Sequence, residues 1–251
     1  MSKILRINNH FKAFGFLSTN IKIVSKVLSL IKNSFLYIIS IPIILIIRTV
    51  RPLIVVRFGK IRNDVIGHFV FDPEYYLSWR ELEKFESIDY FYFDNKNMPN
   101  KHWPLMIKRS LNILSFIKYL DKVNQFIPGG NKHIAILNHF TSRDTRNYLI
   151  KTEPHIKFID KEIKMGRDYL NQCGLLEGDK YVCVISRDST FKNKYSNEGG
   201  RDWSYHSYRN SNIENYQKTI NYLAEKEFFI FRMGKGEEKT IDASHTRVID
   251  Y

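Results

Sequence analysis

Residues 181–234 decide the fold class, and they read YVCVISRDSTFKNKYSNEGGRDWSYHSYRNSNIENYQKTINYLAEKEFFIFRMG. The apolar run at 181–185 is followed by a long polar loop, and apolar residues then recur at helical spacing over 213–226. Two further apolar runs follow, at 228–231 and 247–249. Strands that alternate with helices in this way predict βαβ units around a parallel sheet.

The same alternation is present upstream of this stretch. Strands are predicted at 53–56, 90–93 and 133–137, with helical patterns at 67–84, 104–126 and 164–172. We therefore expect two α/β domains with a boundary near residues 176–180. The first would be a Rossmann-like domain at 52–178, and the second would span 179–251. Because a doubly wound sheet needs more elements than 179–251 can supply, we expect the second domain to be incomplete in this sequence.

Residues 1–51 form a basic and apolar segment. Eleven Lys or Arg and no Asp or Glu occur between positions 1 and 63. An amphipathic pattern over 1–33 precedes the apolar run Phe35–Ile47, which contains Pro42. This run is shorter than the roughly 20 residues of a membrane span, so it predicts a tilted, kinked or re-entrant helix, or a buried core helix as the alternative. We expect an anionic membrane surface as a partner, at the cytoplasmic face of an inner membrane, through peripheral binding or a single N-terminal anchor.

The charge of the rest of the chain argues against nucleic acid as a partner. Net charge is +13, but beyond residue 63 only 28 basic residues (39 minus 11) face 26 acidic ones. Cys173 and Cys183 match no metal-ligand or disulfide spacing, which indicates a reducing compartment. The sequence contains no His-Glu-x-x-His, Gly-x-Ser-x-Gly or Asp-x-Asp motif. We therefore predict neither a metal nor a cofactor.

The first loop with candidate chemistry joins a strand to a helix at residues 62–68. Gly67 would let the backbone approach a ligand, and Arg62 belongs to the same candidate acceptor loop. His68 would lie at a helix N-terminus, where the dipole favours the neutral imidazole that a general base requires. Asp64 is the candidate group to orient it. The alternative is a histidine that only caps or packs the helix.

The second candidate loop follows the strand at 181–185. It contains Arg187, Asp188, Tyr208, Arg209 and Asn210. Arginine suits bidentate contact with phosphate oxygens, and a helix that begins near residue 212 would direct its N-terminus at the same place. These residues predict a site for a diphosphate. The alternative is a solvated surface loop in which Asp188 pairs with Arg187.

A third element, Phe231–Gly236, follows the strand at 228–231. Arg232 at the strand end and Gly234 after it could contact the same diphosphate. Two glycines after a strand often form only a turn, and the spacing does not match the Walker phosphate loop.

These motifs resemble a bacterial family of glycosyltransferases of surface-polysaccharide gene clusters. The similarity lies in Arg187-Asp-Ser, Tyr205-His-Ser-Tyr-Arg-Asn-Ser-Asn-Ile-Glu-Asn-Tyr, Phe231-Arg-Met-Gly, the Gly67-His68 pair and Phe71-Asp-Pro-Glu-Tyr-Tyr-Leu. The resemblance covers about residues 52–251. It implies a GT-B fold of two Rossmann-like domains, a nucleotide-sugar donor and no metal.

The expected function is transfer of a sugar from that donor to a cell-surface glycan or lipid-linked acceptor. In this interpretation Arg187 and Arg209 neutralise the leaving diphosphate, Arg232 assists, and His68 acts as the base. A second interpretation is a non-catalytic α/β protein at the membrane surface that binds a nucleotide or a partner. Nucleic-acid binding ranks below both, because residues 64–251 are nearly balanced in charge.

Overall fold

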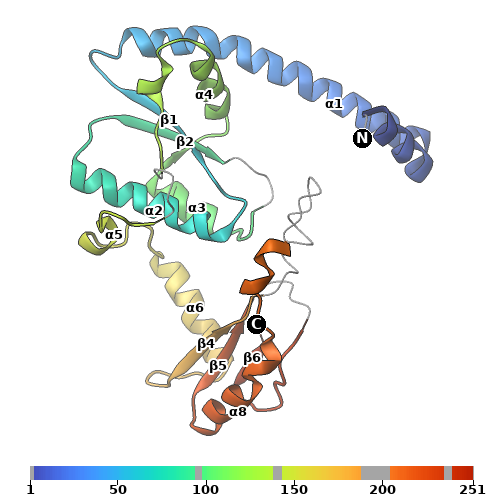
Figure 1. Ribbon diagram of the computed structural model, residues 1–251, viewed down its shortest axis with the longest axis vertical. Coiled ribbons are helices and arrows are strands. Elements are labelled where there is room, and N and C mark those ends of the chain that lie inside the picture. Colours follow the sequence, from blue (N-terminus) through green and yellow to red (C-terminus); the bar gives the residue numbers. More distant parts are fainter. Residues whose placement is uncertain (1–2, 94–97, 138–142, 188–203, 235–238, 251) are drawn as a thin grey trace. The chain divides into compact units, whose positions relative to one another are not determined.

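The computed structural model describes residues 3–93, 98–137, 143–187, 204–234 and 239–250, with residues 3–20, 22–23 and 205–206 described by their backbone only. Contacts divide the chain into two compact units, Met1–Lys157 and Phe158–Tyr251. We call them unit 1 and unit 2, and Figure 1 labels their helices and strands. Both units are of mixed α/β type with parallel sheets, which is compatible with Rossmann-like folds.

Unit 1 is built on a parallel sheet in the order β1-β2-β3. Its strands are β1 (Val56–Ile61), β2 (Ile88–Phe93) and β3 (Asn112–Ile113). Ile134 extends the sheet beyond β1 through an isolated parallel bridge to Phe58. The connecting helices are α2 (Ile66–Glu83) between β1 and β2, α3 (Trp103–Ser110) between β2 and β3, and α4 (Ile117–Phe126) after β3. Two short helices follow, η1 (Gly130–His133) and α5 (Tyr148–Lys151).

Both faces of this sheet are covered by helices. Neighbouring side chains of β2 point to opposite sides and so enter different cores. Phe91 is buried in a core with Phe69 and Tyr76 of α2 and with residues of α3. Tyr92 belongs to a second core, with Phe58, residues of α4 and residues of α1. A sheet covered on both faces is the usual setting of parallel strands.

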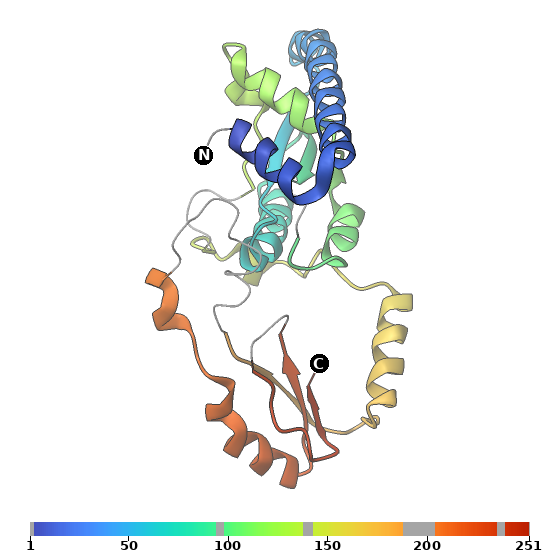
Figure 2. The ribbon, with the colours of Figure 1, turned by 90° about the vertical axis from the view of Figure 1, so that its right-hand side faces the viewer.

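The N-terminal helix α1 (Lys3–Thr49) is 47 residues long and contains Pro42. Its C-terminal part packs against α4, and both views of the ribbon show the two helices side by side (Figures 1 and 2). Residues Val24–Thr49 are long and apolar enough to cross a membrane, by length and composition. The segment is therefore one continuous helix rather than two separate patterns.

Unit 2 contains a second parallel sheet in the order β4-β5-β6. Its elements are α6 (Asp160–Gln172), β4 (Tyr181–Ile185), η2 (Ser204–Arg209), η3 (Ile213–Tyr216), α8 (Gln217–Glu225), β5 (Phe229–Met233) and β6 (Val248–Asp250). Phe229 and Phe231 pack with Leu170 of α6, whereas Ile230 packs with residues of α8. Figure 2 shows α6 and α8 on opposite faces of this sheet.

Several expectations from the sequence differ from the observed elements. The strand predicted at 133–137 is reduced to an isolated bridge at Ile134. The first strand begins at Val56 rather than residue 53, so the predicted basic loop contains most of β1. The predicted helix 104–126 is interrupted by β3, because Leu111–Ile113 extends alongside β2. The boundary lies at residues 157/158 rather than near 178, because Leu170 and Leu175 pack against β5 and join α6 to unit 2.

Candidate functional site

The predicted acceptor loop lies at the carboxyl end of β1 and forms a polar cluster. His68 is the third residue of α2, and its Nδ1 lies 3.3 Å from Oδ2 of Asp72, one helical turn further on. The guanidinium of Arg62 contacts both neighbours, with Nη1 3.0 Å from Nε2 of His68 and Nε 3.0 Å from Oδ1 of Asp64. We predicted that Asp64 orients His68, but the carboxylate that contacts Nδ1 of His68 belongs to Asp72.

These contacts define the tautomer of His68. A guanidinium can only donate hydrogen bonds, so Nε2 of His68 accepts from Arg62. The ring proton of a neutral imidazole is then on Nδ1 and faces the carboxylate of Asp72. A carboxylate at Nδ1 that leaves Nε2 as the basic atom is the arrangement of a histidine general base. The side chain of Arg62 is half-exposed, so its contact with Nε2 is made at the surface.

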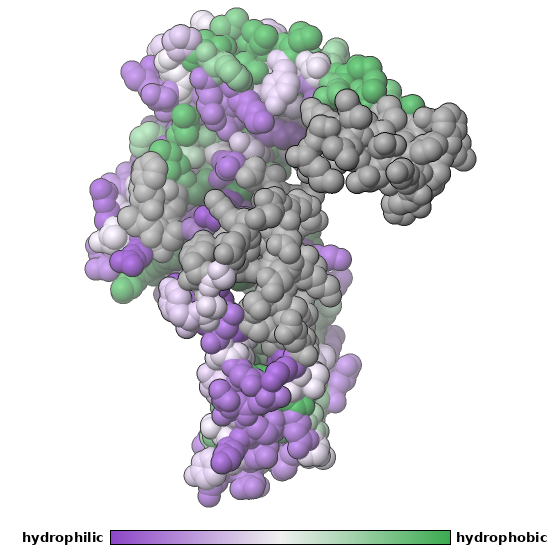
Figure 3. All heavy atoms as spheres, turned by 45° about the vertical axis from the view of Figure 1, so that its right-hand side comes forward, coloured by the Kyte–Doolittle hydropathy of each residue, from purple (hydrophilic) through white to green (hydrophobic). Residues whose placement is uncertain are grey.

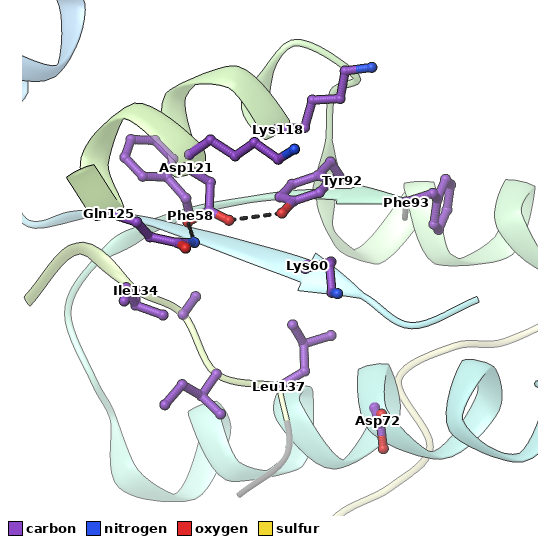
Figure 4. A pocket seen from close by; sticks show the side chains of 13 residues that line it. Phe58, Lys60, Asp72, Tyr92, Phe93, Lys118, Asp121, Gln125, Ile134 and Leu137 are labelled. Carbon is purple, nitrogen blue, oxygen red and sulfur yellow. Dashed lines mark hydrogen bonds between the residues drawn. The ribbon is translucent and has the colours of Figure 1, made fainter. Parts of the chain in front are cut away.

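A pocket of about 640 Å³ lies beside this cluster in unit 1. Asp72, whose carboxylate contacts His68, is one of its lining residues. Figure 4 shows Lys60 near the end of β1, Asp72 on α2, and Lys118 and Asp121 on α4 around this space. Ligands of parallel α/β sheets bind beyond the carboxyl ends of the strands, and the pocket occupies that edge.

The described lining of this pocket has an excess of positive charge. Lys60, Lys118 and Lys122 line it together with Asp72 and Asp121. Asp121 is buried and accepts hydrogen bonds from Tyr92 Oη (2.8 Å) and from Gln125 on the next turn (3.0 Å). Its charge is therefore partly satisfied within the protein, whereas the exposed ammonium groups of Lys118 and Lys122 can turn toward a ligand. This chemistry suits a phosphate-bearing ligand.

Gly67 begins α2 together with Ile66, and it is exposed. A Cβ atom added to Gly67 would have no heavy atom within 4 Å. The backbone there has no positive φ, so the chain itself does not require glycine at this position. The expectation that Gly67 permits close approach of a ligand remains a prediction.

Hydrogen bonds connect the two ends of the predicted donor loop of unit 2. The backbone N–H of Ser211 donates to the carbonyl of Arg187 (2.8 Å), and the Ser186 hydroxyl donates to the carbonyl of Ser211 (2.9 Å). Ser186 is buried and Arg187 is partly buried just beyond β4. This junction brings Arg187 next to the segment that contains Asn210, although the two residues are far apart in the sequence.

The other predicted donor residues lie on or after η2. Tyr208 is 78% exposed, and the guanidinium of Arg209 lies over its ring, 5.8 Å from the centroid. Asn210 is exposed and its backbone N–H donates to the carbonyl of Ser207. Asp188 lies outside the described residues. Arg209 and Tyr208 therefore present a cation and an aromatic ring to solvent near the junction.

The helix that follows this loop begins differently from the expectation. Asn212 caps η3 by accepting from the backbone N–H of Glu214, and the α-helical turns of α8 begin only at Gln217. Glu214 forms an ion pair with Lys239 (2.7 Å). The hydrogen bonds from Lys239 and Asn212 lower the pKa of Glu214, which keeps it ionised. A negative side chain in the first turn weakens the predicted contribution of this helix end to an anion site.

Arg232 does not extend into the predicted donor site. Its side chain is buried and forms an ion pair with Asp250 (3.0 Å) and a hydrogen bond to the carbonyl of Lys239 (2.7 Å). These partners neutralise the guanidinium and fix it between β5 and β6. We therefore assign Arg232 a structural role instead of the predicted role in the donor site. Gly234 is exposed immediately after β5.

A second charged cluster in unit 1 is structural rather than part of the pocket. It lies at the amino end of β2, where Asp89 accepts hydrogen bonds from Arg57 (2.7 Å to each oxygen) and from Tyr76. Burial alone would raise the pKa of Asp89, but these hydrogen bonds and the charge of Arg57 outweigh burial and lower it. Burial and the bond to Asp89 raise the pKa of Tyr76, so the phenol stays protonated.

Four residues of the site are not predicted by the sequence analysis, namely Lys60, Asp72, Lys118 and Lys122. Asp72 carries a detectable signal, because a residue four positions after His68 on a helix lies on the same face. The lysines carry no such sequence signal, because they come from β1 and α4, which are far apart in the sequence.

Within the described residues, no group of three or more His, Cys, Asp or Glu could hold a metal, and both cysteines are free thiols.

Comparisons of the chain with models of protein families, with curated proteins and with solved structures gave no match. The resemblance of residues 52–251 to glycosyltransferases therefore stays a prediction.

Proposed function

We propose that the chain is a membrane-associated glycosyltransferase with a GT-B arrangement of two Rossmann-like units. It would transfer a sugar from a nucleotide-sugar donor to a glycan or lipid-linked acceptor. The observation that carries the proposal is the His68–Asp72 pair beside a lysine-lined pocket at the carboxyl edge of a parallel sheet. A base next to a phosphate-binding pocket suits an acceptor that carries both a reacting hydroxyl and a phosphate.

In the proposed reaction, Nε2 of His68 takes the proton of the acceptor hydroxyl as the oxygen bonds to the anomeric carbon of the sugar. The bond between that carbon and the diphosphate oxygen breaks, and the nucleoside diphosphate leaves with the electron pair. Asp72 stabilises the imidazolium through Nδ1. Arg187 and Arg209 stabilise the charge that develops on the diphosphate, as arginine does at phosphoryl leaving groups.

Incubation of the chain, in vesicles, with a panel of nucleoside-diphosphate sugars and a polyprenyl-phosphate-linked sugar tests this proposal. Labelled sugar should appear in the lipid fraction. Arg187→Ala should lower turnover about 100-fold or more through loss of leaving-group stabilisation. Arg167→Ala, an exposed arginine on α6 of the same unit, is the matched control and should keep full turnover.

His68→Ala separates catalysis from donor binding. The base contributes to the chemical step, so transfer should fall about 10²–10⁴-fold while donor affinity stays within about twofold. Asp72→Asn should give a smaller loss, because the amide can still accept from Nδ1 but does not stabilise the imidazolium. Nucleotide binding without sugar transfer by any donor would favour the non-catalytic nucleotide-binding protein, and absence of both would refute the transferase proposal.

A further inference from the structure

The C-terminal part of α1 has one face directed into unit 1. Asn33 accepts a hydrogen bond from Tyr119 Oη (2.5 Å), and Tyr37 packs edge-on against the same ring. Ser40 and Ile44 are fully buried one and two turns later. These positions recur every three to four residues, so a single face of α1 is occupied by the protein from residue 33 onward.

The opposite face of the same turns is apolar and exposed. Phe35 is 60% exposed, Ile38 64%, Leu45 51% and Ile46 63%. A surface helix of a water-soluble protein normally carries charged and polar side chains on this face. Figure 3 shows the resulting band of hydrophobic residues along the described part of α1. Apolar side chains are also exposed further toward the N-terminus, at Leu28 and Ile31 (61% and 62%).

Basic residues accompany this apolar face. Lys26 and Lys32 lie on the N-terminal side of the packed turns, and Arg51 follows the helix. Residues 1–63 contain no acidic side chain, so nothing in this part of the sequence offsets their charge. An apolar helix face flanked by basic residues is suited to the interface between the acyl chains and the anionic headgroups of a membrane.

We propose that α1 lies in the plane of an anionic membrane surface, with the face of Phe35, Ile38 and Leu45 among the lipids, and does not cross the bilayer. This inference rests only on the membrane-association part of the proposed function and not on glycosyl transfer. It assigns the exposed face to phospholipid, and it explains why a helix with the length of a span has a protein-bound face.

The packing of α1 against α4 argues against a crossing orientation. Residues 33–48 extend about 22 Å along the helix, most of the hydrocarbon thickness of a bilayer. If they crossed it, α4 would enter the hydrocarbon beside them with its exposed Lys118, Lys122 and Gln125. Charged side chains in that region are strongly disfavoured. The stretch 24–32 is too short to cross by itself and contains two lysines.

Electrostatics also favours lipid over a second copy of the chain on this face. Two copies paired through α1 would bring Lys26, Lys32 and Arg51 of each close to the same basic residues of the other. Anionic headgroups would instead neutralise these charges. A second copy is therefore an outcome of the test rather than the occupant that we propose.

Depth measurements distinguish the two membrane orientations. Single nitroxide labels would be placed at residues 31, 38 and 45 of a chain in which Cys173 and Cys183 are replaced by serine. The chain would be bound to vesicles of phosphatidylcholine mixed with anionic phosphatidylglycerol. Positions 31 and 45 lie about 21 Å apart along the helix. An in-plane helix gives three similar depths, whereas a crossing helix gives depths that differ by most of that distance and overturns the proposal.

Flotation with the same vesicles tests whether lipid is the occupant. Ile38→Glu with Leu45→Glu should lower vesicle binding by about tenfold or more, and pure phosphatidylcholine should bind the original chain more weakly than the anionic mixture. The matched control, Ile150→Glu with Leu176→Glu, changes two exposed apolar residues outside α1 and should bind as before. Labels that show mutual dipolar broadening and no lipid contact would identify a second copy and refute the lipid assignment.

These results are independent of transferase activity. A chain that floats with equal label depths but transfers no sugar supports the in-plane helix and rejects the transferase proposal. A chain that transfers sugar with labels at unequal depths rejects only the in-plane helix.

Discussion

Asp89 shows how a single buried carboxylate stabilises unit 1. Its side chain is 1% exposed and accepts hydrogen bonds from Arg57, Tyr76, Arg80 and Ser87. Asp89→Asn would leave the buried guanidinium of Arg57 without its counter-charge, which costs about 3–5 kcal/mol in comparable buried pairs. Urea denaturation should show this loss. The control Asp64→Asn removes a half-exposed pair with Arg62 and should change stability by less than about 1 kcal/mol.

The same carboxylate predicts how stability depends on pH. The pKa of Asp89 is lower in the folded chain than its ordinary value of about 4. A lowered folded pKa contributes stability that is fully present above about pH 4 and is lost as pH falls through the folded pKa. Urea midpoints measured from neutral to strongly acidic pH should therefore fall less steeply for Asp89→Asn than for the original chain. Equal slopes for both proteins would contradict this assignment.

Gly67 and Gly166 form a matched pair of exposed helical glycines. Neither would bring an added Cβ within 4 Å of another heavy atom. Alanine in place of either should keep or raise stability, by up to about 1 kcal/mol. If the backbone at Gly67 approaches the acceptor, only Gly67→Ala should lower sugar transfer. Thermal melts give the stability, and equal activity of the two variants would remove Gly67 from the proposed site.

Arg48 joins α1 to α4 at the level of whole elements. Its guanidinium donates to the carbonyls of Asn124, Ile127 and Pro128 at 2.6–2.9 Å, which satisfies the C-terminal end of α4. Arg48→Ala should therefore cost about 2–3 kcal/mol and raise amide exchange in α4. Arg51→Ala, an exposed arginine outside the helix, should change stability by less than about 0.5 kcal/mol. Unchanged exchange in α4 would show that other contacts hold α1.

Apolar runs predicted most elements from the sequence, with errors where polar residues are buried. The strand at 181–185 is predicted with its observed limits, and β2, β5 and β6 are predicted to within two residues. The predicted first strand ends too early, because a charged residue such as Arg57 is typical of a loop. Its ion pair with Asp89 allows Arg57 to lie in the buried strand β1. The break between α3 and α4 is hidden because Ile107, Leu111 and Leu114 recur at helical spacing across it.

The candidate site is only partly predictable for a related reason. Arg62, His68 and Arg187 follow strands, so the rule for parallel sheets identifies them. Asp72 and the pocket lysines depend on which helix packs beside which strand, and that is a tertiary property. Arg232 shows the opposite error, because a strand-end arginine satisfies the same rule although Asp250 holds it inside the unit.

The charge of the whole molecule is also more informative when it is divided by segment. Net charge of +13 would suggest a nucleic-acid partner, but its excess lies between positions 1 and 63, together with the exposed apolar face of α1. For this combination we propose a membrane surface rather than a polyanion as the partner. The fold also places α4, with two of the three pocket lysines, next to the helix that we propose lies at the lipid boundary. A lipid-linked acceptor is consistent with that arrangement.

Because each unit has its own core and its own buried ion pair, we predict that the two units respond separately to mutation. Asp250→Asn removes the carboxylate that pairs with the buried guanidinium of Arg232 and should lower amide protection only in residues 158–251. Asp89→Asn should do so only in residues 3–157. Hydrogen exchange followed by mass spectrometry resolves the two regions on one sample. Loss of protection in both regions for either variant would mean that the units unfold as one cooperative structure, and the two cores would then be energetically coupled.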